Sequence, residues 1–240
     1  MDSKNSKIVT FGDSWTDNCN TDSWPNKLAH LLNRELIQLG QRGSCNQTIL
    51  SRILEQTYNP ADIVVVMWSN PWRIFNPYVV RGINVASSDI ELSTQDSTEA
   101  EYIKAFGRFY LGRKDNKGEY AIARQSLQQA LLVQEFFKNK NILCIQCYNY
   151  IDMTKDFTDL PELNLIDKNK FYGLGLQTIS NLLGGGDIQG SGLQLEQGKE
   201  ANAKYWSDKD CWTHPGPLGH KLIAETLKKC LDNSDDSIYN

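Results

Sequence analysis

A serine near the start of the chain and a histidine near its end have the side chains that nucleophilic chemistry needs. Ser14 follows the short apolar run Ile8–Phe11, and His214 precedes the last helical stretch. A nearby imidazole can take the serine proton as the hydroxyl attacks a carbonyl, and can later pass that proton to the leaving group. A carboxylate must then fix the tautomer of the imidazole and stabilise its charged form. This pair predicts a hydrolase that acts on an acyl group.

Gly12-Asp13-Ser14 by itself is more typical of a turn than of a catalytic site, because Asp and Ser after Gly are ordinary turn formers. The catalytic interpretation gains support from Gly43 and Asn70, which follow two further predicted strands. The backbone N–H groups of Ser14 and Gly43, together with the Asn70 amide, would stabilise a developing oxyanion. Glycine suits position 43, because its backbone can approach a substrate with no Cβ in the way.

Apolar patterning predicts the elements that must position these residues. We expect strands at about 8–11, 35–39, 62–68 and 141–147, and helices at about 25–33, 48–56, 99–110, 121–138, 163–170 and 222–227. Strands that alternate with helices predict an α/β sandwich with a mostly parallel sheet. The unbroken apolar run at 62–68 is typical of a strand covered on both faces. Ligands bind beyond the carboxyl ends of such strands, and Ser14 lies at one of these ends.

With these segments in this order, the chain resembles the SGNH hydrolases, also called the GDSL esterase/lipase family. The matching blocks are Gly12-Asp13-Ser14, Gly43 with Ser44 and Asn46, Asn70, and His214-Pro215 with Gly219-His220. The resemblance covers most of the chain and implies a single domain over residues 1–240. It also implies a three-layer α/β/α, flavodoxin-like sandwich, a mechanism without metal or cofactor, and a shallow, exposed site. The absence of G-x-S-x-G argues against the α/β-hydrolase alternative.

The chain departs from the family pattern in two places. The third block is usually Gly-x-Asn-Asp, whereas here it is Trp68-Ser69-Asn70-Pro71. The triad aspartate usually stands three residues before the histidine, where this chain has Cys211. We expect Asp210 to complete the triad, because a one-residue bulge suffices to bring it to the imidazole, and Asp208 is the alternative.

Several large side chains flank the proposed catalytic positions. Trp15 and Trp72 are predicted to bind substrate as an aromatic wall for a sugar ring or acyl chain, although packing beneath the loops is the alternative. Arg73 is predicted to bind an acidic substrate group, with a salt bridge as the alternative. His220 is expected to have a structural role, because His214 already fills the base position.

The composition bounds the partners and the compartment. The net charge is −4 and we find no basic run, which argues against a nucleic-acid partner. No stretch reaches the ~20 apolar residues that span a bilayer. No signal sequence precedes the first strand, so we expect a cytoplasmic protein or one released without a signal peptide. Cys144 and Cys147 would face opposite sides of a strand, which favours buried thiols over a metal or redox pair.

Two regions lack a clear pattern. Residues 76–99 have mixed polarity and are predicted to form an insertion. Residues 173–192 are rich in glycine but lack the spacing of a phosphate-binding loop, so a flexible surface loop is expected.

The favoured function is a serine esterase that removes a short acyl group, above all acetyl, from a carbohydrate or another small ester. An acyltransferase or thioesterase of the same fold is one alternative. A catalytically impaired SGNH-like domain that binds glycans or a protein partner is the other.

Overall fold

A parallel sheet of five strands forms the centre of the protein, in the order β2-β1-β3-β6-β7. The computed structural model describes residues 6–17, 22–71, 73–76, 81–84, 117–149, 157–184, 203–207 and 214–235. The strands are β1 (Lys7–Gly12), β2 (Glu35–Gly40), β3 (Ile63–Trp68), β6 (Leu143–Tyr148) and β7 (Phe171–Tyr172). A separate antiparallel hairpin consists of β4 (Arg73–Asn76) and β5 (Arg81–Asn84).

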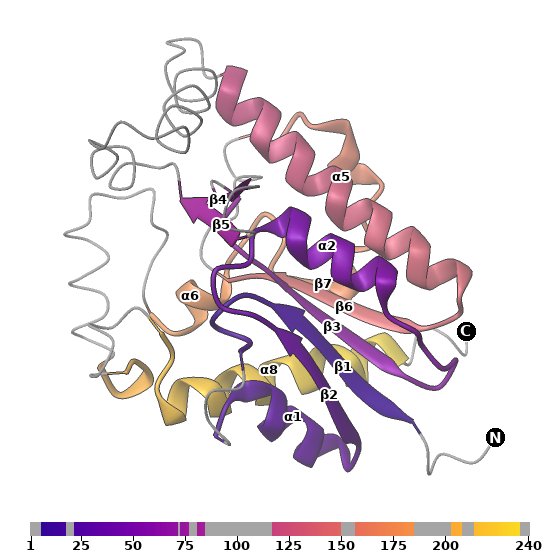
Figure 1. The fold of residues 1–240 in the computed structure, drawn as a ribbon, viewed down its shortest axis with the longest axis vertical. Coiled ribbons are helices and arrows are strands. Elements are labelled where there is room, and N and C mark those ends of the chain that lie inside the picture. Colours follow the sequence, from indigo (N-terminus) through magenta and orange to yellow (C-terminus); the bar gives the residue numbers. More distant parts are fainter. Residues whose placement is uncertain are drawn as a thin grey trace.

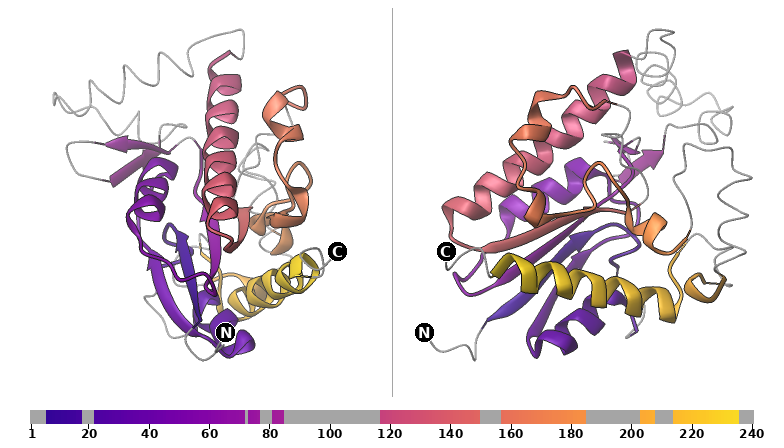
Figure 2. Two further views of the ribbon diagram at one scale, coloured as in Figure 1. Left: turned by 90° about the vertical axis from the view of Figure 1, so that its right-hand side faces the viewer. Right: turned by 180° about the vertical axis from the view of Figure 1, so that it is seen from behind.

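Helices cover both faces of the sheet (Figures 1 and 2). The helices are α1 (Trp24–Leu32), α2 (Asn46–Glu55), α5 (Lys117–Asn139), α6 (Ile179–Leu182) and α8 (Pro217–Asp235). Among the described residues there are also three 3-10 turns: η3 (Pro161–Asn164) and η4 (Lys168–Lys170) lie between β6 and β7, and η5 (Ala203–Tyr205) precedes α8. Helices α2 and α5 lie on one face, and α1 and α8 lie on the other. The predicted three-layer α/β/α sandwich is thereby confirmed.

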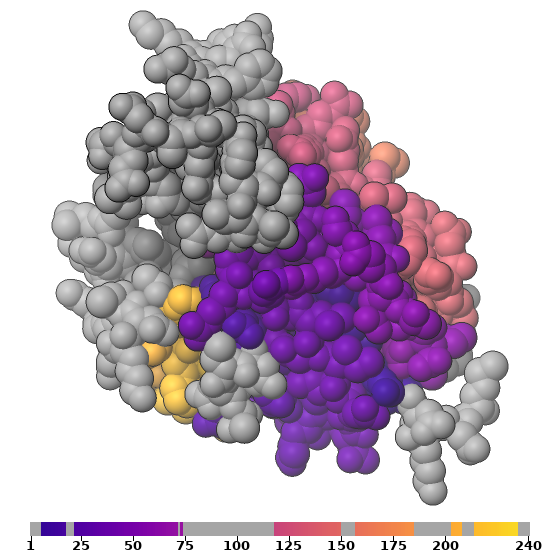
Figure 3. Space-filling view, viewed as in Figure 1, coloured from indigo at the N-terminus to yellow at the C-terminus, as the bar shows by residue number. Residues whose placement is uncertain are grey.

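Alternating side chains of the central strands enter two separate cores. Val64 and Val66 pack with residues of α2 and α5, whereas Val65 and Met67 pack with residues of α1 and α8. Every residue of β3 is buried as a result. This explains why the strand has an unbroken apolar run rather than an alternating one. In the space-filling view, the first third of the chain forms most of the described surface on one face, beside α5 (Figure 3).

The structure corrects the prediction at several segments. Residues 163–170 form parts of two 3-10 turns instead of one helix, and α2 begins two residues earlier than predicted, at Asn46. The described part of the glycine-rich segment contains α6, and Ile179 and Leu183 within it are fully buried. That part is therefore anchored in the core rather than lying loose on the surface. The hairpin ends inside the predicted insertion at 76–99, and the remainder of that insertion, like the helix expected at 99–110, lies outside the described residues.

Two opposed glycines at the ends of β1 and β2 fix the segment that follows β1. Gly12 and Gly40 are partners in the sheet register, and Thr16 packs over both. A Cβ at Gly40 would lie 2.6 Å from the Thr16 carbonyl carbon, so no larger residue fits there without a shift. The Gln38 side chain on β2 also donates to the Thr16 carbonyl. The turn that contains Ser14 is therefore held against β2 as well as β1.

His220 of α8 caps the first turn of α1. The backbone N–H of Trp24 donates to His220 Nδ1 at 3.2 Å, while the side chain of Ser23 at the N-cap position makes no capping bond. An imidazole nitrogen that accepts a hydrogen bond carries no proton. Burial, with smaller contributions from Lys27 and His214, lowers the pKa of His220 from 6.5 to about 4. The contact therefore selects the neutral ring and has a structural role.

We predict that acid weakens the fold through His220. Its pKa is about 4 in the folded protein and about 6.5 in an unfolded chain, so the unfolded state binds the proton first as the pH falls. The His220 contribution to the free energy of unfolding is complete above pH ~6.5. It is lost between pH ~6.5 and ~4, by up to about 3 kcal/mol. Urea unfolding at a series of pH values measures this loss.

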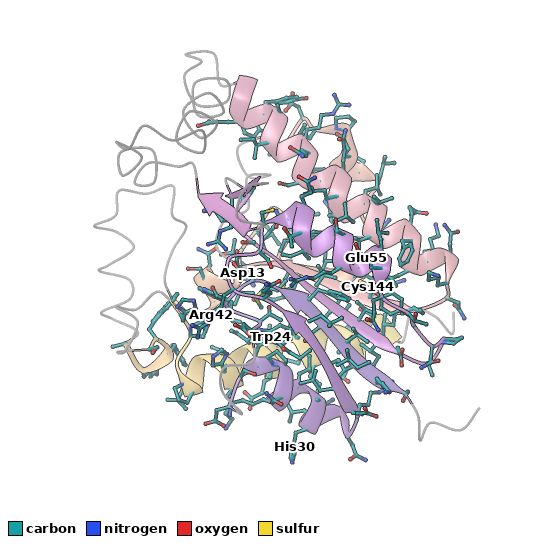
Figure 4. The ribbon with its side chains drawn as sticks, in the orientation of Figure 1. Asp13, Trp24, His30, Arg42, Glu55 and Cys144 are labelled. Carbon is teal, nitrogen blue, oxygen red and sulfur yellow. The ribbon has the colours of Figure 1, made fainter. Side chains whose placement is uncertain are left out.

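His220→Gln is the informative variant, because its amide oxygen can still accept from the N–H of Trp24 but does not titrate. It should flatten the pH dependence in this window. His30→Gln is the matched control, since His30 is exposed on α1 and points away from the sheet (Figure 4). An unchanged pH dependence in His220→Gln would contradict the assignment.

Candidate active site

Ser14 lies in a tight turn immediately after β1. The backbone N–H groups of Thr16 and Asp17 both donate to the carbonyl of Asp13, each at 3.0 Å, and Ser14 is half-buried within this turn. β1 lies between β2 and β3, so the chain leaves β1 where the order of the strands reverses direction. In open α/β sheets, such switch points hold the ligand-binding crevice beyond the carboxyl ends of the strands.

The structure brings His214 to Ser14 from the far end of the chain. His214 Nε2 lies 2.9 Å from Ser14 Oγ, within hydrogen-bond distance. The N–H of Ser207 donates to the His214 carbonyl at 3.0 Å, and Pro215 forms a β-bridge with Trp206. The segment 203–207 therefore fixes the backbone on which the imidazole stands.

Two buried indoles connect the serine turn to the histidine segment. The rings of Trp15 and Trp206 meet edge to face with centroids 5.7 Å apart, and their exposed fractions are 2% and 3%. Trp206 Nε1 also donates to the Leu183 carbonyl at 3.1 Å. This burial corrects the expected aromatic wall at Trp15, because its indole packs in the core. Trp72, the other expected wall residue, lies outside the described residues.

Gly43 and Asn70 follow the two strands that flank β1. Gly43 has a φ of 74°, in the left-handed region that favours glycine. The N–H of Gln41 donates to the Gly12 carbonyl at 3.1 Å, which ties this loop to the end of β1. Asn70 is 7% exposed, and its carbonyl accepts from the N–H of Arg73 at 3.0 Å. Both predicted oxyanion residues thus lie in loops at the carboxyl edge of the sheet where Ser14 stands.

A buried carboxylate beneath the serine turn is the main feature that the sequence reading missed. Asp13 Oδ1 accepts from the N–H of Trp15 at 3.0 Å. Asp13 Oδ2 accepts from Ser69 Oγ at 2.7 Å, from Asn149 Nδ2 at 2.9 Å and from Arg73 Nη1 at 3.1 Å. Asn149 directly follows β6, and this place after a buried strand was the one available signal for it. Asp13 thereby joins the carboxyl ends of β1, β3 and β6.

Arg73 forms the ion pair that was the alternative to a substrate contact. Its side chain is 23% exposed, and that of Asp13 is 3% exposed. The guanidinium charge is therefore matched by a carboxylate inside the protein, which favours the ion pair over a contact with an acidic substrate group. Asp210 and Asp208, the candidates for the triad carboxylate, lie outside the described residues.

The described ranges contain no reactive thiol pair and no metal-binding cluster beside the Ser14–His214 pair. Cys144 and Cys147 are free, buried thiols, as expected, and burial raises the pKa of both. No group of three or more His, Cys, Asp or Glu side chains in those ranges is arranged to hold a metal ion. Of the helices described, none has the length and apolar character to cross a membrane.

Of the comparisons with known proteins, the one with solved structures bears on the fold. No protein-family model and no curated protein matches the sequence. Among solved structures, a protein of the lipolytic G-D-S-L family from Desulfitobacterium hafniense aligns over 94% of this chain and 99% of its own, with a TM-score of 0.50 and 16% identity.

Two further solved structures align over 93% of this chain. A lipolytic G-D-S-L protein from Veillonella parvula has a TM-score of 0.45, 16% identity and 97% of its own length covered. An acetyl xylan esterase has a TM-score of 0.47, 14% identity and 98% of its own length covered. The likeness to the Desulfitobacterium protein is one of fold along nearly the whole of both chains, so this chain has the α/β fold of the GDSL, or SGNH, hydrolases.

Proposed function

We propose that the protein is a serine esterase. The observation that carries the proposal is the 2.9 Å contact between Ser14 Oγ and His214 Nε2. A hydroxyl and an imidazole at hydrogen-bond distance form the activated pair of nucleophilic acyl transfer. The pair lies at the strand switch point of the sheet, where ligands of this fold class bind.

The proposed reaction has two halves. His214 Nε2 takes the Ser14 proton while Oγ bonds to the ester carbonyl carbon, and the carbonyl oxygen becomes an oxyanion. When the tetrahedral intermediate collapses, the carbon–oxygen bond to the leaving alcohol breaks and His214 returns the proton to that alcohol. A water molecule activated by the same imidazole then cleaves the acyl-serine, which releases the acid and regenerates Ser14.

Three donors are proposed for the oxyanion. The N–H groups of Ser14 and Gly43 and the side-chain amide of Asn70 come from the loops after β1, β2 and β3, which are neighbouring strands. Such fixed donors stabilise the transition state because they need no reorientation as the charge develops. The third block therefore keeps its functional amide, although Trp68 and Pro71 flank it in place of the usual residues.

We propose Asp210 as the carboxylate that orients the imidazole, with Asp208 as the alternative. For the substrate we propose a short acyl ester, with an acetyl group on a carbohydrate favoured, because such esters are usual for the hydrolases that the sequence resembles. Initial rates on acetylated sugars and on p-nitrophenyl esters of rising acyl length test this choice. A preference for long acyl chains would contradict it.

Ser14→Ala tests the proposed function directly. It should abolish hydrolysis of p-nitrophenyl acetate above the uncatalysed background, because the attacking oxygen is lost. Ser51→Ala is the matched control, since Ser51 is exposed on α2. Equal rates for the wild type and Ser14→Ala would overturn the esterase proposal and favour a binding domain.

Asn70→Ala tests the oxyanion donor. Loss of one such donor should lower kcat by about 10²–10³-fold. KM should change little, because the donor acts mainly on the charge that develops after substrate binds. Steady-state kinetics beside a thermal melt separates the two roles. A large fall in Tm with kcat unchanged would mark Asn70 as structural.

A pair of isosteric variants assigns the triad carboxylate. Asp210→Asn should lower kcat by about 10⁴-fold, because the amide favours the wrong imidazole tautomer, whereas Asp208→Asn should remain within about threefold of the wild type. The two variants carry the same chemical change and serve as controls for each other. The reverse order of effects would assign Asp208.

A further inference from the structure

We propose that Arg73 is a positioning residue for the oxyanion hole, an inference that rests on the proposed esterase function. In this role, Arg73 fixes the loops that carry Gly43 and Asn70 relative to the serine turn. Its side chain acts through the backbone of these loops and does not contact substrate.

Arg73 reaches the loops after three neighbouring strands. Its Nη1 lies 3.1 Å from Asp13 Oδ2, 3.1 Å from Ser69 Oγ and 3.3 Å from the Ser44 carbonyl. Ser44 is the residue directly after Gly43. The backbone N–H of Arg73 donates to the Asn70 carbonyl at 3.0 Å. One residue thus holds the immediate neighbour of one proposed donor and the backbone of the other.

The charge of Asp13 explains why residue 73 carries a guanidinium. A carboxylate with 3% of its side chain exposed is costly unless a cation and further donors compensate it. The hydroxyl of Ser69 donates to Asp13 and accepts from Arg73, which closes a three-membered network. Removal of Arg73 would leave the Asp13 carboxylate without its cation and release the Ser44 carbonyl.

The altered third block gives a local reason for this arrangement. Pro71 follows Asn70 and has no backbone N–H, so it cannot stabilise the loop by donating a hydrogen bond. The loop is instead closed two residues later, where the N–H of Arg73 bonds to Asn70 at the first residue of β4. The hairpin β4–β5 begins at the residue that fastens the oxyanion loops.

The test compares kcat and KM for two esters, neutral p-nitrophenyl acetate and anionic mono-p-nitrophenyl succinate. Arg73→Gln should lower kcat by ~10- to 100-fold on both, because donors displaced by even a fraction of an ångström bind the transition state less well. KM should stay within about twofold. Arg73→Lys should recover part of kcat, since it restores the charge beside Asp13 without the planar fork.

Arg42→Gln is the matched control. Arg42 also pairs with an aspartate of the serine turn, Asp17 at 3.2 Å, but its side chain is 71% exposed and lies outside the network. Asp13 and Arg42 lie at the same end of the sheet (Figure 4). The kcat of Arg42→Gln on both esters should stay within about twofold of the wild type.

The outcomes separate the two proposals. An active wild type with unchanged kcat in Arg73→Gln would overturn the positioning role alone. So would a rise in KM confined to the anionic ester, which would mark Arg73 as a substrate contact. A wild type without turnover that depends on Ser14 would overturn the esterase proposal and this inference with it. If Arg73→Gln does not fold, Arg73→Lys tests the positioning role. A lower kcat with unchanged KM on both esters would support it, and wild-type kcat would overturn a role that needs the guanidinium.

Discussion

The carboxylate of Asp13, held out of water beneath the serine turn, is the constraint around which the carboxyl end of the sheet is built. A buried charge loses its hydration and must recover that energy from fixed donors and a cation. Here the donors come from residues just after β3 and β6, and the cation comes from the start of β4. A shift of any one of these segments alone would remove one of the contacts that compensate the charge. The turn that contains Ser14 is therefore held in place by the carboxyl ends of β1, β3 and β6.

His214 is anchored in a different part of the molecule. Its backbone is tied to the segment 203–207, which precedes α8, and α8 packs on α1 in the helical layer below the sheet. The indoles of Trp15 and Trp206 connect the two anchoring systems in the core. The proposed active site therefore lies between two layers of the fold. The ends of the strands fix Ser14, and the segment 203–207 and α8 fix His214.

Sequence patterns predicted the central strands and the main helices, because each has a local signal. The motif blocks and their order predicted that Ser14 and His214 lie together, although 200 residues separate them. Buried parallel strands are continuous apolar runs, and the site blocks follow strand ends. The Asp13 network was missed because its partners belong to no motif block: Asn149, 136 residues away along the chain, is marked only by its place after a buried strand. Trp15 could not be placed from its type, since a large indole suits a core and a binding wall equally. The short helix α6 was not predicted, because the glycines around it favour a loop.

Ser14 and His214 are held by different parts of the fold, which has a consequence for the relation between the proposed activity and the stability of the fold. The distance between Ser14 and His214 depends on the position of α8 relative to the sheet. A small displacement of that helix would separate the two side chains while every strand stays paired. Such a molecule would keep its full sheet content and yet lose the proposed hydrolase activity. Loss of the proposed activity on heating would thus precede the cooperative melt, and the contact between Ser14 and His214 would be the contact most sensitive to the packing of α8 on the sheet.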